Sequence, residues 1–187
     1  MRRKIIISLL ILSFLAAAGS VFWWWQNQKD VRDLNKTLPE GVRVVKGLWG
    51  NEYKVVNKID GYEFKVPKEW NGIEEIEYIA NREAEGFKGT SIFVMGRIGQ
   101  ARTVSIDVFE ADEDRQLKEW AQYFFDIFDL AGTFNGTKIG NLDVIKTNEN
   151  EHLGGAYIYF IEKNKKNYVF TGGSEEFISE IILNGQW

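Results

Sequence analysis

Residues 103–132 read TVSIDVFEADEDRQLKEWAQYFFDIFDLAG, and this stretch contains both kinds of element from which we expect the fold to be built. In its first part Val104, Ile106 and Val108 alternate with other residues, which predicts a strand with one face in the core. The apolar residues of the second part recur at the spacing of one helix face: Leu117, Trp120, Ala121, Phe124, Ile127, Phe128 and Ala131. A strand followed by an amphipathic helix therefore stands at the centre of the predicted fold.

Both ends of this predicted helix carry end signals. Asp112 is a suitable N-cap, and Glu113 and Asp114 would complement the helix dipole in the first turn. Gly132 can adopt the left-handed conformation that often follows a helix. These residues predict a long helix that spans most of residues 112–132.

Strand patterns dominate the sequence before residue 103. The predicted strands are 42–46, 53–59, 62–67, 72–87 and 91–96. Asp60-Gly61 lies between the second and third of these and predicts a two-residue hairpin turn. The segment 72–87 also fits a helix, but its bounding glycines favour a strand.

After residue 132 the pattern is strand-rich again and ends in a short helix. The segment 138–147 predicts one strand, and 155–173 predicts two strands around a polar turn at Lys163–Asn167. A helix then starts from Ser174 as N-cap. The expected class is α+β: a largely antiparallel sheet packed against one long and one short C-terminal helix, preceded by an N-terminal transmembrane helix.

Composition excludes several function classes. The 187 residues carry a net charge of −4, and because Arg2, Arg3 and Lys4 are the only charges in residues 1–25, the remainder carries −7. Such a balance argues against a nucleic-acid partner, which requires a basic face. The chain has no cysteine, so disulfides and thiolate chemistry are excluded.

The N-terminal segment is the clearest guide to location. Ile5 to Trp25 is a run of 21 uncharged residues, and as a helix it would span about 32 Å, close to the thickness of a bilayer core. We interpret residues 1–25 as a transmembrane signal-anchor, with Trp23, Trp24 and Trp25 at the membrane interface. A signal peptide cleaved after Ala16-Ala17-Ala18 is the alternative, and it would leave a secreted protein.

Charges on the two sides of this run indicate its orientation. Arg2, Arg3 and Lys4 adjoin it and favour a cytoplasmic N-terminus, although basic residues within 29–36 also lie close to its other end. The expected localisation is the cell membrane, with a single pass and an extracytoplasmic C-terminal domain. Residues 26–40 are polar and predict a tether or a short, loosely held helix, and 41–187 form the folded domain.

Several aromatic motifs resemble those of PsbP-like domains. They are GYEFKVPKEW at 61–70, IGNLDVIKT at 139–147, GAYIYFIEKNKKNYVF at 155–170 and EEFISEIILNGQW at 175–187. The resemblance covers roughly residues 50–187 and implies an antiparallel sheet between helices. That family contains extrinsic photosystem subunits and membrane-tethered bacterial proteins, which are binding or assembly factors rather than enzymes, and no metal-binding residue is carried over from it.

Candidate site residues are few. His152 is the single histidine, and with Glu149 and Glu151 it would be the starting point for a metal-binding or small-ligand sensor, although a solvated loop explains it better. Trp49, between glycines in a predicted loop, is the candidate binding residue. We expect no enzyme activity, no cofactor and no metal, and a protein or envelope component as partner.

Overall fold

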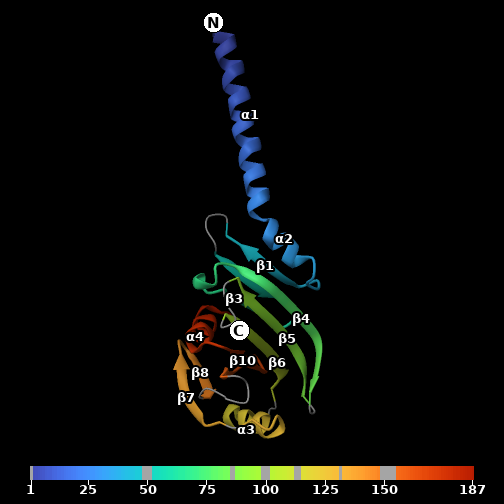
Figure 1. The fold of residues 1–187 in the computed structure, drawn as a ribbon, viewed down its shortest axis with the longest axis vertical. Helices are drawn as coiled ribbons and strands as arrows, with labels where there is room; N and C mark the ends of the chain where they lie inside the picture. Colours follow the sequence, from blue (N-terminus) through green and yellow to red (C-terminus); the bar gives the residue numbers. More distant parts are fainter. Residues whose placement is uncertain are drawn as a thin grey trace.

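The computed structural model describes residues 2–47, 52–84, 87–97, 102–111, 115–130, 132–147 and 155–187. Its helices are α1 (Arg2–Asn27), α2 (Lys29–Asn35), α3 (Leu117–Ile127) and α4 (Glu175–Asn184), with one turn of 3₁₀-helix, η1 (Lys68–Trp70). Figure 1 shows a domain of sheets and short helices from which α1 projects at one end, while α3 lies at the other. The predicted α+β class is confirmed.

Seven strands form one large antiparallel sheet. They are β4 (Ile73–Ala84), β5 (Phe87–Gly96), β6 (Thr103–Glu110), β7 (Phe134–Ile139), β8 (Leu142–Thr147), β9 (Tyr157–Lys163) and β10 (Lys166–Gly172). Their order is β4-β5-β6-β10-β9-β8-β7, so the central pair, β6 and β10, is far apart in sequence. β4 and β7 are the two edge strands.

A small antiparallel sheet and α4 cover one face of the large sheet. Its strands are β1 (Val42–Lys46), β2 (Tyr53–Asn57) and β3 (Tyr62–Lys65), in that order. The core between the layers includes Phe64 and Val55 from the small sheet, Ile106 and Phe170 from the large sheet, and Ile181 from α4. Alternation along β6 points Val104, Ile106 and Val108 into this layer, as the sequence predicted, and Tyr168 and Phe170 of β10 lie in it as well.

The other face of the large sheet packs against α3. Its core is strongly aromatic, and the rings around Trp120 are those of Phe87, Phe109, Phe124 and Phe160. Trp120 is buried, as is Trp70, the last residue of η1, whose ring contacts that of Phe177. Trp187 closes the opposite layer, where its ring contacts those of Tyr62 and Phe170 and its Nε1 donates to the Ile182 carbonyl.

Two hairpin turns differ from the sequence prediction. The β2–β3 hairpin pairs Asn57 with Tyr62, so its loop has four residues rather than two, and Gly61 takes a positive φ of 83° in it. The Asn57 side chain explains the longer loop, because its Oδ1 accepts the N–H groups of Ile59 and Asp60. The segment predicted as one strand, 138–147, is part of the β7–β8 hairpin, which turns at Gly140 with a φ of 59°.

The central helix is shorter than predicted at both ends. α3 begins at Leu117, and the N–H of Gln116 donates to Glu119 Oε2, which satisfies part of the first turn. The expected N-cap, Asp112, lies outside the described residues. At the other end Asp129, rather than Gly132, adopts the left-handed conformation, and the Leu130 N–H bonds back to the Phe125 carbonyl.

The N-terminal helix α1 is continuous over 26 residues. The large apolar side chains that the structure describes on α1 are exposed, and Phe14 is exposed to 74%. The structure does not describe the side chains of residues 1–5, Ser8 and Leu9. Over the residues that it does describe, no helix is both long and apolar enough to cross a membrane.

Candidate binding site beside the N-terminal helix

The helix α2 is fixed to the domain by packing and by hydrogen bonds. Val31 is buried in the core between the sheets, and Leu34 packs against it. The Asn35 side chain pairs with β1 as a strand would: its Nδ2 donates to the Val44 carbonyl at 2.9 Å, and its Oδ1 accepts the Val44 N–H at 2.7 Å. The folded part of the chain therefore includes α2, although the sequence assigned residues 26–40 to a tether.

A cluster of hydrogen bonds around Asp30 joins α2 to three other segments. One oxygen, Oδ2, accepts from the Tyr53 hydroxyl, from Lys46 Nζ at 3.3 Å and from Arg97 Nη2 at 3.1 Å. The other, Oδ1, accepts the backbone N–H of Val31 at 2.9 Å. We call Asp30, Lys46, Tyr53 and Arg97 the Asp30 cluster.

The Asp30 cluster favours a charged carboxylate. Partial burial alone would raise the pKa of Asp30, but the hydrogen bonds from Tyr53 and Val31 and the charge of Lys46 outweigh it, so its pKa is lowered. Burial and the bond to Asp30 raise the pKa of the Tyr53 hydroxyl. The cluster therefore holds an ionised aspartate and a neutral tyrosine at neutral pH.

The end of α1 is attached to the same cluster. Lys46 Nζ donates to the Asn27 carbonyl at 3.1 Å, in the last turn of α1. Arg32 donates to the Trp25 carbonyl at 2.7 Å, and its guanidinium lies 4.3 Å from the centre of the Trp25 ring. Polar contacts thereby link α1, α2 and β1, so α1 is not joined to the domain by a flexible linker alone.

A groove of about 810 Å³ opens beside this junction, between α2 and β4. Buried Ile73 and Ile76 and the half-buried Leu34 provide its apolar lining. The charged residues that line it are Asp30, Asp33, Glu74, Glu75, Glu77 and Arg97. We call this the α2–β4 groove, and its lining is strongly acidic because five carboxylates face one arginine.

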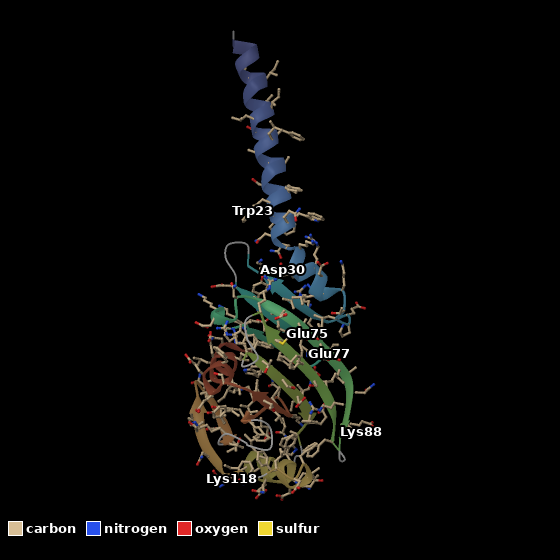
Figure 2. All side chains as sticks on the ribbon, viewed as in Figure 1. Trp23, Asp30, Glu75, Glu77, Lys88 and Lys118 are labelled. Atoms are coloured by element: carbon tan, nitrogen blue, oxygen red, sulfur yellow. The ribbon has the colours of Figure 1, made fainter. Side chains whose placement is uncertain are left out.

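The wall of the groove is the first half of an edge strand. β4 pairs with β5, and among the described residues no other segment bonds to its outer edge. Glu75 and Glu77 are exposed and flank the buried Ile76. Figure 2 places Glu75 and Glu77 on the part of β4 nearest α2, with Asp30 across from them.

A second cavity, of about 280 Å³, lies on the other face of the large sheet beside α3. Phe124, Phe128 and Leu130 form its apolar side, and its polar side contains an ion pair between Arg82 and Asp107. Asp107 is almost fully buried, which raises the pKa of its carboxyl although the charge of Arg82 opposes the shift.

The hydroxyls beside this ion pair complete a small polar network. Arg82 donates to Ser91 Oγ at 3.2 Å, and Ser105 Oγ donates to Asp107 Oδ1 at 3.5 Å. Each member of the pair thus has a further hydrogen bond to a neighbouring hydroxyl. This arrangement explains how a charged pair is tolerated beside an aromatic core.

The structure describes only some of the site residues that the sequence predicted. Trp49, the candidate binding residue, lies outside the described residues, and so do His152, Glu149 and Glu151. Within the described part of the chain, no group of three or more His, Asp or Glu side chains could hold a metal ion. Trp23, Trp24 and Trp25 lie on α1 and are about half exposed.

The α2–β4 groove was missed because its two walls are distant in sequence. Asp30 looked like one charge in a polar tether, and its partner Arg97 is 67 residues away. The alternation of acidic and apolar residues in Glu75-Ile76-Glu77 does predict a strand with one solvent-exposed face. What no pattern disclosed was that β4 lies at the edge of the sheet.

Comparisons with known proteins add little to this description. No family model matches the chain, and no curated relative matches its sequence. A GTP binding regulator from Thermotoga maritima, known from a crystal structure, shares 15% identity with a TM-score of 0.37. That similarity covers 60% of this chain and 76% of the regulator, and at this level it assigns neither family nor function.

Proposed function

We propose that the chain is a membrane-anchored binding or assembly protein that presents the α2–β4 groove to a protein partner outside the cytoplasm. The observation that carries the proposal is the junction itself: the Asp30 cluster fixes α2 to the domain, and the end of α1 is bound to the same cluster. The groove is thereby held at a set distance from α1.

The properties of α1 support a role as the anchor. Ile5 to Trp25 contains no charged residue, and the described side chains of α1 show no polar face. Its exposed apolar side chains include Leu10, Leu12, Phe14, Leu15, Val21 and Phe22. Exposure of so many large apolar side chains costs free energy in water, and a lipid environment would remove that cost.

Orientation follows from the charges beside the run. Arg2, Arg3 and Lys4 favour retention of the N-terminal side in the cytoplasm, which would place the folded domain on the other side. The three tryptophans at the domain end of α1 suit the membrane interface, where an aromatic ring can lie at headgroup level.

We place the function with binding rather than catalysis because the arginine–aspartate contacts of both cavities are committed to the fold. Arg97 is bonded to Asp30 at the groove, and Arg82 is bonded to Asp107 beside α3. The resemblance to PsbP-like domains supports the same reading and stays a prediction.

Membrane fractionation tests the proposal. We expect the full chain, expressed in a bacterium, to stay with the membrane pellet after an alkaline wash and to be released by detergent. Replacement of Ile11 and Phe14 by aspartate should move the chain to the soluble fraction, whereas Ser13→Ala should not. Recovery of the intact wild-type chain in the supernatant would contradict the anchor.

Protease treatment of spheroplasts tests the orientation. An extracytoplasmic domain should be digested without lysis, and a domain protected until the membrane is opened would reverse the assignment. The mass of the purified chain separates an anchor from a cleaved signal peptide, because cleavage after Ala18 removes the first 18 residues.

A further inference from the structure

We infer that the outer edge of β4 binds an extended segment of a partner protein, with alternating basic and apolar residues, by strand addition in the α2–β4 groove. The inference specifies the partner class for the proposed function and rests on it for the location of the site. Its basis is the combination of an open strand edge, an apolar lining and an acidic rim along the same residues.

The open backbone edge is the first requirement. β4 runs from Ile73 to Ala84 and bonds to β5 on one side only, within the part of the chain that the structure describes. Its pairing with β5 is regular from Glu75 to Ile79, between irregularities at Ile73/Glu75 and Ile79/Arg82, so over this stretch alternate N–H and C=O groups point outward and are free to pair with an added chain. Strand addition would satisfy these groups with main-chain hydrogen bonds.

The side chains of β4 then select the added sequence. Glu75 and Glu77 pair with Met95 and Phe93 and point to one face, whereas Ile76 pairs with Val94 and points into the core layer. Residues opposite one another on adjacent strands share a face, so an added strand would place alternate side chains against the two glutamates. Lysine or arginine at those positions, with apolar residues between them, complements the groove.

The one cation of the groove does not cancel its acidity. Arg97 Nη2 is bonded to Asp30, which also accepts from Lys46 and Tyr53, so the Asp30 cluster, with two cations and one carboxylate, carries one net positive charge. Three further carboxylates, Glu74, Glu75 and Glu77, are exposed along the strand. A basic segment is therefore the occupant that the charge of the groove favours.

A second copy of this chain fits the same segment poorly. Antiparallel pairing of two copies about Ile76 would place Glu75 of each copy opposite Glu77 of the other. Like charges in directly opposed strand positions destabilise pairing. The geometry thus points to a heterologous partner.

The test uses the full-length chain in detergent micelles and a fluorescent synthetic peptide of alternating lysine and valine, about eight residues long to match the strand. We expect this peptide to bind and its glutamate–valine counterpart not to bind. Added salt should weaken binding, because exposed charges are screened. A lysine–valine peptide with an N-methylated backbone should not bind either, since it cannot form the ladder.

A pair of charge-reversal variants locates the site. Replacing Glu75 and Glu77 by lysine should weaken binding by at least about tenfold, because it opposes like charges. The control replaces Glu162 on β9 and Glu176 on α4, which are exposed outside the groove and off β4, by lysine and makes the same change in net charge. Equal loss in both variants, or binding of the N-methylated peptide, would overturn the inference in favour of a diffuse charge effect.

Amide hydrogen exchange distinguishes strand addition from binding by charge alone, because only strand addition protects backbone amides of β4. Bound peptide should slow exchange of amides in the first half of β4 and leave β7, the other edge strand, unchanged. Unchanged exchange in β4, or no binding of the lysine–valine peptide, would also overturn strand addition. Fractionation with the membrane does not depend on any of these results, so failure of the anchor and failure of the groove are separate outcomes.

Discussion

Asp30, at the junction with α1, and Asp107, beside α3, each bond to an arginine, yet their pKa values shift in opposite directions. At the junction Asp30 accepts from Tyr53, Lys46, Arg97 and a backbone N–H, and its pKa is lowered. Beside α3 the burial of Asp107 dominates, and its pKa is raised despite Arg82. Both carboxylates accept several hydrogen bonds, and the degree of burial decides the direction: the partial burial of Asp30 is outweighed by its donors, whereas the almost complete burial of Asp107 is not.

The two regions therefore differ in what holds them together. The junction is built from charged and hydrogen-bonded groups that link α1 and α2 to β1, β2 and the end of β5. The α3 face is built from stacked and edge-on aromatic rings, and its ion pair lies at the margin of a cavity. Substitutions in the two regions should therefore differ in how much they change the free energy of unfolding and in how that change depends on pH.

Trp120→Ala should have the largest effect on stability. The ring is buried and contacts the rings of Phe87, Phe109, Phe124 and Phe160, so its loss leaves a cavity. We expect a loss of about 3–5 kcal/mol in the free energy of unfolding. Urea titration of the full chain in a mild detergent, followed by tryptophan fluorescence and circular dichroism, measures it.

Lys118→Ala on the same helix is the matched control. Lys118 is exposed on the outside of α3 (Figure 2), so its removal should change the free energy by less than about 0.5 kcal/mol. If both substitutions cost the same, the α3 face is not held by its aromatic core.

Asp30→Asn should have the second largest effect. The amide cannot accept hydrogen bonds from Lys46, Tyr53 and Arg97 as the carboxylate does, and we expect a loss of about 2 kcal/mol at pH 7. The pKa of Asp30 is lower in the folded chain than its ordinary value of 3.8, so its stabilisation is present above that value and is lost as the pH falls. The difference between wild type and variant should therefore shrink on acidification.

Asp33→Asn is the control at the junction, because Asp33 lies on the same helix and bonds only to the exposed Lys36 among the contacts described for its side chain. It should leave the unfolding curve at neutral pH essentially unchanged. A pH-independent gap between wild type and Asp30→Asn would show that Asp30 acts through packing rather than through its charge.

Most of the fold was predictable because its signals are local. The alternation of Val104, Ile106 and Val108 and the spacing of Trp120 and Phe124 each report which face is buried, and the structure confirms them. The errors fell where side chains set the turn: Asn57 lengthens the β2–β3 loop by capping it, and Asp129 ends α3 before Gly132. Such contacts depend on geometry that residue patterns do not encode.

The candidate site was not predictable, because it is an arrangement of distant segments. The contact between Asp30 and Arg97 requires the small sheet, α2 and the end of β5 to assemble first. The edge position of β4 depends on the pairing of β6 with β10, which places later strands on the far side of the sheet. Sequence patterns indicate which face of a strand is exposed to solvent, but they do not indicate which strands lie beside it.

Asp107→Asn should have the smallest effect at neutral pH and the opposite dependence on pH. The carboxyl is buried, so its charged form is disfavoured, and Arg82 is exposed to 37%, so water can solvate it once its partner is an amide; we expect stability to change by less than about 1 kcal/mol at pH 7. Its pKa in the folded chain is raised above the ordinary value of 3.8, so the wild type is favoured below that value and loses stability as the pH rises through the folded pKa.

The variant cannot ionise, so relative to wild type it should gain stability with rising pH, whereas Asp30→Asn should lose stability relative to wild type over the same rise. Urea titrations of the three chains between about pH 3 and 7 measure both trends, and differences between chains cancel the titration of all shared groups. Asp143→Asn, at an exposed aspartate on β8 paired with Lys138, controls for loss of a surface ion pair. Parallel pH trends for Asp30→Asn and Asp107→Asn would mean that Arg82 outweighs burial at Asp107, and that both ends of the domain are held by charge in the same way.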